Sequence, residues 1–206
     1  MATKYYAFII ERENIKEVVT TWEECQKKTK GKGARYKSFK KENDAWEWLN
    51  QGGIYENKKE KIELLKESLK EGIYFDAGTG RGIGVEVRVT DIIGTSLLHE
   101  TMPEHMINEF GNYHAPKGST NNYGELIGLY LAIDIALKLG YKHIFGDSKL
   151  VIDYWSKGAC NKTSLNEKTI NLISKTSLRR VKFQELGGVI EHVSGDINPA
   201  DLGFHK

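Results

Sequence analysis

The sequence is poor in cysteine and proline, and it contains no long apolar run. Its 206 residues include 2 cysteines and 3 prolines. Cys25 and Cys160 lie far apart, without the spacing of a zinc site or of a disulfide scaffold, so we expect two reduced, structural thiols. No stretch reaches the roughly 18 apolar residues of a membrane helix, and the first residues lack the charged-then-apolar order of a signal peptide. We therefore expect a cytoplasmic protein without a membrane partner.

The net charge is also small, but it is unevenly distributed. The formal net charge of +2 divides into +3 for residues 1–50 and −1 for the remainder. The hydrophobic content of 39% is sufficient for a packed core, and the length allows one domain of ordinary size with a small one beside it. The basic part of the chain is therefore the N-terminal part.

Residues 1–50 have the pattern of a small ββαβα unit. Apolar runs predict the strands, and a capping box followed by helical spacing predicts the helices. The predicted elements are strands at 5–10 and 15–19, a helix from Thr21-Trp-Glu-Glu24 to about 28, a strand at 36–39 and a helix at about 41–49. A unit of about 50 residues is near the lower limit for independent folding.

This unit interleaves aromatic and basic residues. Trp22, Tyr36 and Lys37 are the candidates for contact, because aromatic faces stack on bases or sugars and cations neutralise phosphates. Further cations nearby are Lys28, Lys30, Lys32 and Arg35. The alternative is that Trp22 and Phe39 belong to the core and the lysines are solvated.

Trp46 and Trp48 lie in the second predicted helix. For these two tryptophans we favour the core.

Four segments of this unit resemble the hybrid-binding (viroplasmin-like) domain of type 1 ribonucleases H. They are Tyr-Tyr-Ala-Phe at 5–8, Thr-Thr-Trp-Glu-Glu-Cys at 20–25, Ala-Arg-Tyr-Lys-Ser-Phe at 34–39 and Ala-Trp-Glu-Trp-Leu at 45–49. The resemblance implies that Trp22 and Tyr36 pack on the DNA strand of an RNA/DNA hybrid and that Lys37 contacts phosphate. The family often has a second lysine where this chain has Ser38, which implies a weaker phosphate contact here.

Residues 51–71 are highly charged and carry Ile62, Leu65 and Leu69 at roughly helical spacing. The high charge and the helical spacing of these apolar residues predict a charged helical linker. We therefore divide the chain into a hybrid-binding domain at 1–50, a linker at 51–71 and a second domain at 72–206.

The second domain opens with Ile73 to Phe75, an apolar run that predicts a buried strand, followed by Asp76. A buried, uncompensated carboxylate costs several kcal/mol, so a metal ion is an economical partner for it. The glycines at 78–84 superficially suggest a dinucleotide fingerprint. That fingerprint requires a helix directly afterwards, but residues 83–89 alternate like a strand and 92–98 predict a third one, so we reject it.

Two later acids also follow apolar segments. Glu125 is predicted in the first turn of a helix that runs from Thr120 to a C-cap at Gly140, where the helix dipole alone would explain a carboxylate. Asp147 follows the predicted strand 141–145, and an N-cap is its alternative explanation.

Asp after a strand, Glu in a helix and Asp after a further strand follow one another in this sequence. This order identifies a fold family more specifically than any one of the acids does. Asp76-x-Gly, Thr-Asn-Asn-x-x-Glu-Leu at 120–126 and Asp147-Ser-x-x-Val-Ile resemble the catalytic core of ribonuclease H, over essentially all of residues 72–202. The resemblance implies an α/β fold with a mixed five-stranded sheet flanked by helices.

The fourth acid is where the sequence departs from that family. Asn-Pro-Ala-Asp201 makes Asp201 our choice, and Asp196 is the alternative. The family's loop histidine, which shuttles protons, is absent. His192 and His205 are candidates to replace it, but we expect structural or terminal roles for both.

The resemblance also implies the chemistry. Two Mg²⁺ ions about 4 Å apart, with Mn²⁺ as a substitute, suit carboxylate ligands. Asp76 would bridge both ions, Glu125 and Asp147 would hold one, and the fourth acid would hold the other. Glu125 would also reach a 2′-hydroxyl. In the family, loop residues contact phosphate and the hybrid backbone. The matching residues here are Thr120, Asn121 and Asn122.

The predicted function is an endoribonuclease, expected to be a monomer, that cuts the RNA strand of RNA/DNA hybrids and leaves 5′-phosphate and 3′-hydroxyl ends. The altered C-terminal segment motivates the alternative of a non-catalytic hybrid or double-stranded RNA binder. A nuclease of the same fold that cuts DNA is a further alternative.

Overall fold

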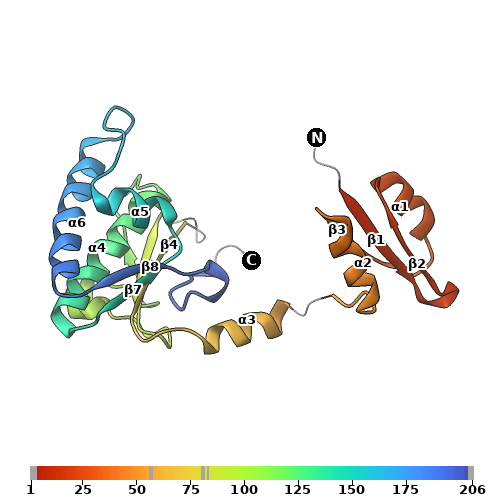
Figure 1. The fold of residues 1–206 in the computed structure, drawn as a ribbon. Helices are drawn as coiled ribbons and strands as arrows, with labels where there is room; N and C mark the ends of the chain where they lie inside the picture. Colours follow the sequence, from red (N-terminus) through yellow and green to blue (C-terminus); the bar gives the residue numbers. More distant parts are fainter. Residues whose placement is uncertain (1–3, 56–57, 80–81, 83, 204–206) are drawn as a thin grey trace. The chain divides into compact units, whose positions relative to one another are not determined.

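The computed structural model describes residues 4–55, 58–79, 82 and 84–203 (Figure 1). The chain forms two compact units, Met1–Lys61 and Ile62–Lys206. Within the described ranges, no helix combines the length and the apolar character that crossing a membrane requires. Cys25 and Cys160 are both free thiols, as expected.

The first unit is a three-stranded antiparallel sheet with the order β2-β1-β3. Its elements are β1 (Tyr5–Ile10), the 3₁₀ turn η1 (Glu11–Glu13), β2 (Ile15–Val19), α1 (Trp22–Thr29), β3 (Arg35–Phe39) and α2 (Glu42–Asn50). The hydroxyl of Thr21 accepts a hydrogen bond from the Glu24 amide, as the capping box predicts. The ββαβα order is therefore confirmed.

Two small apolar clusters, one on each face of this sheet, form the core of the first unit. Phe8 and Cys25 lie on the α1 side, whereas Ile9 and Trp48 lie on the α2 side. The prediction that Trp46 belongs to the core is wrong, because its side chain is 42% exposed. Two residues along an α-helix amount to about 200° of rotation, so Trp46 and Trp48 face opposite directions.

Residues 51–55 belong to the first unit and contact its helix α2, before helix α3 (Lys58–Glu67) begins. The indole Nε1 of Trp48 donates to the Ile54 carbonyl at 2.8 Å. The phenol ring of Tyr55 lies 5.8 Å from the Trp48 ring. The first five residues of the segment that the sequence predicts as a linker are thus part of the first unit.

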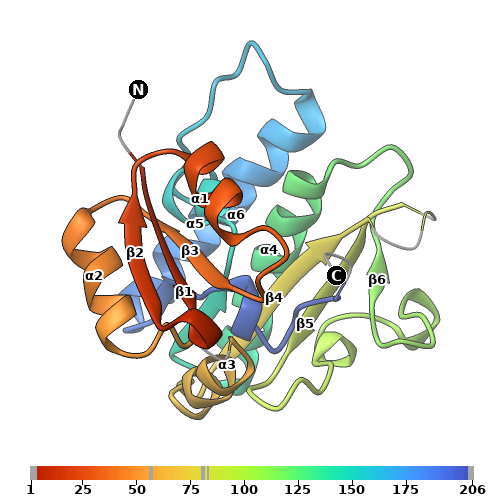
Figure 2. The same ribbon diagram turned by 90° about the vertical axis from the view of Figure 1, so that its right-hand side faces the viewer.

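The second unit contains a mixed five-stranded sheet with the order β6-β5-β4-β7-β8. Its strands are β4 (Ile73–Gly78), β5 (Glu86–Thr90), β6 (Tyr113–His114), β7 (His143–Gly146) and β8 (Val189–His192). Strands β4, β5 and β6 pair antiparallel and lie side by side in Figure 2, whereas β4, β7 and β8 pair parallel. This is the mixed α/β arrangement that the resemblance implies.

The helices of the second unit cover one face of the sheet, where α4 and α6 pack against each other (Figure 1). They are α4 (Asn121–Leu139), α5 (Lys149–Asp153) and α6 (Glu167–Glu185), with 3₁₀ turns η2 (Leu98–Glu100), η3 (Glu104–Met106), η4 (Trp155–Lys157) and η5 (Gly195–Ile197). Gly140 ends α4 with φ at 83°, which confirms the predicted C-cap. On the other face, Val193 and Ala200 of the C-terminal segment pack on Tyr74 and Phe145.

The third strand of the sheet is not where the sequence placed it. Residues 92–98 do not form a strand, because the Asp91 carboxylate accepts hydrogen bonds from the amides of Ile93 and Thr95 and turns the chain there. Strand β6 takes the predicted strand's place in the sheet. Part of the glycine turn at 78–84 and the predicted start of the next strand at residue 83 lie outside the described residues.

Candidate metal centre and nucleic-acid contacts

Asp76 and Asp147 extend from neighbouring parallel strands at the same end of the sheet. Tyr74 of β4 pairs with Phe145 of β7, and their rings stack with centroids 4.8 Å apart. Each aspartate lies two residues further along the chain, Asp76 within β4 and Asp147 directly after the end of β7. Because side chains alternate between the two faces of a sheet, both carboxylates extend to the side on which those rings stack.

Glu125 reaches the same place from helix α4, which can lie close to the sheet because residue 124 is glycine. A Cβ atom on Gly124 would lie 2.3 Å from Val85 Cγ1 and 2.9 Å from Ala77 Cβ. The Ala77 amide donates to Glu125 Oε1 at 3.3 Å. The prediction that Glu125 lies in the first helical turn is wrong, since it is the fifth residue of α4. The helix dipole therefore does not account for its position.

The three acids form a compact, buried group. One carboxylate oxygen from each of Asp76, Glu125 and Asp147 lies within 4.8 Å of the others, and Asp76 and Glu125 are only 5% and 4% exposed. Burial raises the pKa of Asp76 to about 6, and the charge of Asp147 adds to it, although a hydrogen bond from the Leu202 amide opposes the shift. Burial and the charges of both aspartates raise the pKa of Glu125 to about 10. Holding all three charges together without a cation is unfavourable.

The donors in this group suit a hard divalent cation. Mg²⁺ and Mn²⁺ prefer oxygen ligands, and all three side chains offer carboxylate oxygens. Glu125 Oε2 is buried and has no hydrogen-bond partner among the described residues, so a cation could use it as a ligand. The residues present therefore fit a divalent metal ion.

Asp201, our choice for the fourth acid, lies next to the residue that contacts Asp76. The amide of Leu202 donates to Asp76 Oδ2 at 3.1 Å. The carboxylate of Asp201 accepts from the Gly203 amide at 2.9 Å, and its own amide donates to the Asn198 carbonyl. Asp201 does not belong to the three-residue group in the described part of the chain.

The alternative, Asp196, lies in η5 beside Asp147. Its neighbour Gly195 approaches so closely that a Cβ there would lie 2.7 Å from Asp147 Oδ2. The ring Nε2 of His192 lies 3.1 Å from the Asp147 carbonyl oxygen. Asp196, like Asp201, is outside the three-acid group among the residues described. His205 lies outside the described residues.

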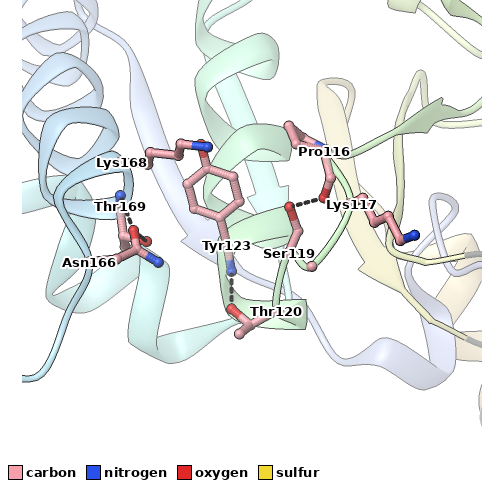
Figure 3. Close-up of a pocket in the computed structure, with 9 residues that line it drawn as sticks. Pro116, Lys117, Ser119, Thr120, Tyr123, Asn166, Lys168 and Thr169 are labelled. Atoms are coloured by element: carbon pink, nitrogen blue, oxygen red, sulfur yellow. Dashed lines mark hydrogen bonds between the residues drawn. The ribbon is translucent and has the colours of Figure 1, made fainter.

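A cavity of about 160 Å³ lies where two helices begin (Figure 3). Thr120 caps α4 by accepting from the Tyr123 amide, and Asn166 caps α6 by accepting from the Thr169 amide. The lining residues are Pro116, Lys117, Gly118, Ser119, Thr120, Tyr123, Asn166, Lys168 and Thr169. Two positive helix ends and two lysines at one cavity are suited to bind an anion such as phosphate.

The structure thus adds residues that the sequence analysis missed. Asn166, Lys117 and Lys168 come from segments to which no role was assigned. The Asn166-x-x-Thr169 pattern ahead of a helix is a recognisable cap, but nothing in the sequence places it beside Thr120. Asn121 and Asn122, predicted to contact the backbone of a hybrid, are exposed in the first turn of α4.

In the first unit, Trp22 and Tyr36 form an exposed aromatic pair. Their ring centroids lie 5.4 Å apart, and the Tyr6 ring centroid lies 5.8 Å from that of Trp22. Trp22 is 39% exposed and Tyr36 is 45% exposed, so neither is a core residue. Lys37 does not lie with them, because strand alternation turns it to the face of Phe39, where its Nζ lies 5.5 Å from the ring centroid.

Three of the cations near Trp22 and Tyr36 in the sequence are paired with acids. The pairs are Lys28 with Glu17 and Glu24, Lys32 with Glu13, and Arg35 with Glu11. Exposed pairs of this kind contribute little to stability, so these cations can exchange a carboxylate for a phosphate at small cost.

Comparison with known proteins supports the resemblance of the first unit. Residues 4–49 match the family model described as the Ribonuclease H1 N-terminal domain. The resemblance predicted for this unit is confirmed. No curated protein matches the sequence significantly.

Two solved structures are similar to parts of the chain. One is the N-terminal RNase H domain of rv2228c from Mycobacterium tuberculosis, with 23% identity over 60% of this chain and 85% of that chain and a TM-score of 0.35. The other is RNase H1 from Halobacterium salinarum NRC-1, with 23% identity over 60% of this chain and 84% of that chain and a TM-score of 0.33.

Proposed function

We propose that the chain is an endoribonuclease that hydrolyses the RNA strand of RNA/DNA hybrids. The observation that carries this proposal is the convergence of Asp76, Glu125 and Asp147 at one end of a mixed sheet. Two of these acids are almost fully buried, where carboxylates are costly unless they bind cations. The matched N-terminal unit supports a nucleic acid as the substrate.

Asp76, Glu125 and Asp147 would hold Mg²⁺ or Mn²⁺, and Asp201 would complete a site for two ions. When bound, the ions would supply Lewis-acid stabilisation of the phosphate charge and a reactive water. Cleavage of the RNA strand would leave 5′-phosphate and 3′-hydroxyl ends. The chain's own contribution is to hold Asp76 in place through the Leu202 amide and Glu125 through the Ala77 amide.

The substrate would be bound through its backbone. The cavity between the N-caps Thr120 and Asn166 offers helix dipoles and lysines to a phosphate, with Asn121 and Asn122 exposed beside it. Glu125 lies about one and a half helical turns from Thr120, so phosphate binding and the acid group share one rigid helix. Contacts of this kind carry little sequence information, so cleavage would be largely independent of sequence.

The first unit would increase affinity for the hybrid. Trp22 and Tyr36 present adjacent aromatic faces for stacking on the DNA strand, and Lys37 would contact phosphate from the edge of the same sheet. In this proposal residues 1–50 form the hybrid-binding domain, residues 72–206 form the catalytic domain, residues 51–71 connect them, and the protein acts as a monomer.

The test is a cleavage assay with matched duplexes of one sequence. Each strand of RNA/DNA, RNA/RNA and DNA/DNA duplexes is labelled in turn and incubated with the protein in Mg²⁺ or Mn²⁺. The proposal predicts cuts confined to the RNA strand of the hybrid. Binding to the hybrid without cleavage in either metal would instead identify a binding protein, and cuts in DNA would identify a different nuclease.

A further inference from the structure

The outer edge of strand β3 is completed at one position by a side chain. In the order β2-β1-β3, the outer edge of β3 has no neighbouring strand within the described structure. At Tyr36 the backbone amide donates to the Tyr55 hydroxyl at 2.9 Å, and the same hydroxyl donates to the Tyr36 carbonyl at 2.9 Å. One oxygen atom thus makes both hydrogen bonds that the next strand of an antiparallel sheet would make.

The segment that carries Tyr55 is held in place by its own contacts. Gly52 and Gly53 both have positive φ, at 85° and 62°, and turn the chain back towards α2. The Arg35 guanidinium donates to the Gly52 carbonyl at 3.1 Å, and the Trp48 indole donates to the Ile54 carbonyl. A Cβ on Gly53 would lie 3.0 Å from Ile9 Cδ1, so this turn depends on glycine.

We infer that Tyr55 is a positioning residue for the nucleic-acid surface of the first unit, an inference that rests on the proposed function. Tyr36 packs on Trp22, and both rings are exposed, so the Tyr36 backbone is the part of this residue that fixes the ring beside Trp22. Strand β3 is paired with β1 on one side only, so its outer edge is the less constrained side of its backbone. Tyr55 holds this edge in place at Tyr36, although it lies outside residues 4–49, which match the family model.

The test is a binding titration of the full chain with a fluorescent RNA/DNA hybrid in EDTA, which prevents cleavage. Tyr55→Phe retains the ring and removes only the hydroxyl, and we expect roughly a three- to tenfold loss of affinity. Tyr5→Phe is the matched control, because it removes a phenol hydroxyl from the same unit at a position paired with Phe39. We expect its affinity to equal that of the wild type.

A double-mutant cycle separates positioning from general destabilisation. In a Tyr36→Ala background, Tyr55→Phe should cause no further loss, because its effect passes through Tyr36. Unchanged affinity of Tyr55→Phe, or an equal loss in the Tyr36→Ala background, overturns the inference. Trp22→Ala in the same titration reports on the proposed function itself. If it weakens binding while Tyr55→Phe does not, only the role of Tyr55 is wrong.

Discussion

The two units of this protein place their candidate residues in opposite environments. In the first unit, Trp22 and Tyr36 are about two-fifths exposed, whereas in the second unit Asp76 and Glu125 are almost fully buried. Exposed aromatic rings can gain contacts with a partner at little structural cost. Buried carboxylates instead cost free energy in the free protein, which bound cations would offset. Substitutions in the first unit should therefore change affinity, and substitutions in the second should change rate.

The largest effect is expected for Asp76→Asn, which keeps the shape of the side chain and removes its charge. Loss of several kcal/mol of transition-state stabilisation corresponds to a fall in cleavage rate of about 10³-fold or more. Hybrid affinity measured in EDTA should not fall, because Asp76 is buried in the second unit, whereas the exposed pair belongs to the first. Equal losses of affinity and rate would contradict the assignment of binding to the first unit and catalysis to the second.

Asp201→Asn and Asp196→Asn compare the two candidates for the fourth acid. We expect Asp201→Asn to lower the rate by roughly 10²-fold, because one of two ions would lose a ligand while Asp76, Glu125 and Asp147 remain. Asp196→Asn is the matched control, because Asp196 lies in the 3₁₀ turn η5 directly after Gly195, and it should have a much smaller effect. The reverse order of the two rates would make Asp196 the fourth acid.

Trp22→Ala should weaken hybrid binding roughly tenfold, in line with the loss of one stacking contact of about 1–3 kcal/mol. The rate at saturating protein should stay unchanged, because Trp22 belongs to the first unit and the three acids belong to the second. Trp46→Ala removes an equally exposed indole from the same unit and serves as the control. A rate defect of Trp22→Ala that persists at saturation would contradict a purely binding role.

The smallest expected effect is the pH dependence of the free energy of unfolding in the absence of metal. Since folding raises the pKa of Asp76 from 3.8 to about 6 and that of Glu125 from 4.5 to about 10, the folded state binds more protons than the unfolded state between these values. Stability in EDTA should therefore fall as pH rises, by about 1 kcal/mol or more between pH 6 and 8.5. Thermal unfolding checks this. Glu125→Gln should flatten the dependence, and a wild-type stability that rises with pH would contradict it.

The sequence was sufficient to predict what depends on local pattern. The apolar runs before Asp76 and Asp147 predict the two strands, although β4 does not end at Asp76, as predicted, but continues to Gly78. A glycine after a helical pattern predicts the cap at Gly140. Features that depend on tertiary contacts were not predictable. The two-residue strand Tyr113–His114 has no periodicity, and only the packed helices bring Asn166 beside Thr120.

The direction in which a side chain faces was equally hard to predict. Trp46 and Trp48 share a helix, but only Trp48 faces the sheet. Tyr36 and Lys37 are adjacent in sequence but lie on opposite faces of β3. The hydroxyl of Tyr55 completes a strand edge from within a segment whose composition predicts a linker.

The most direct test of the central claim is the single-turnover rate of RNA-strand cleavage at saturating protein, measured as Mg²⁺ is titrated from zero and then repeated with Mn²⁺. We predict no cleavage in EDTA, a rate that rises to a plateau with metal, and products with 5′-phosphate ends. Cleavage that persists in EDTA, or no cleavage of the hybrid in either metal, would contradict the proposal that these buried carboxylates form the catalytic metal site.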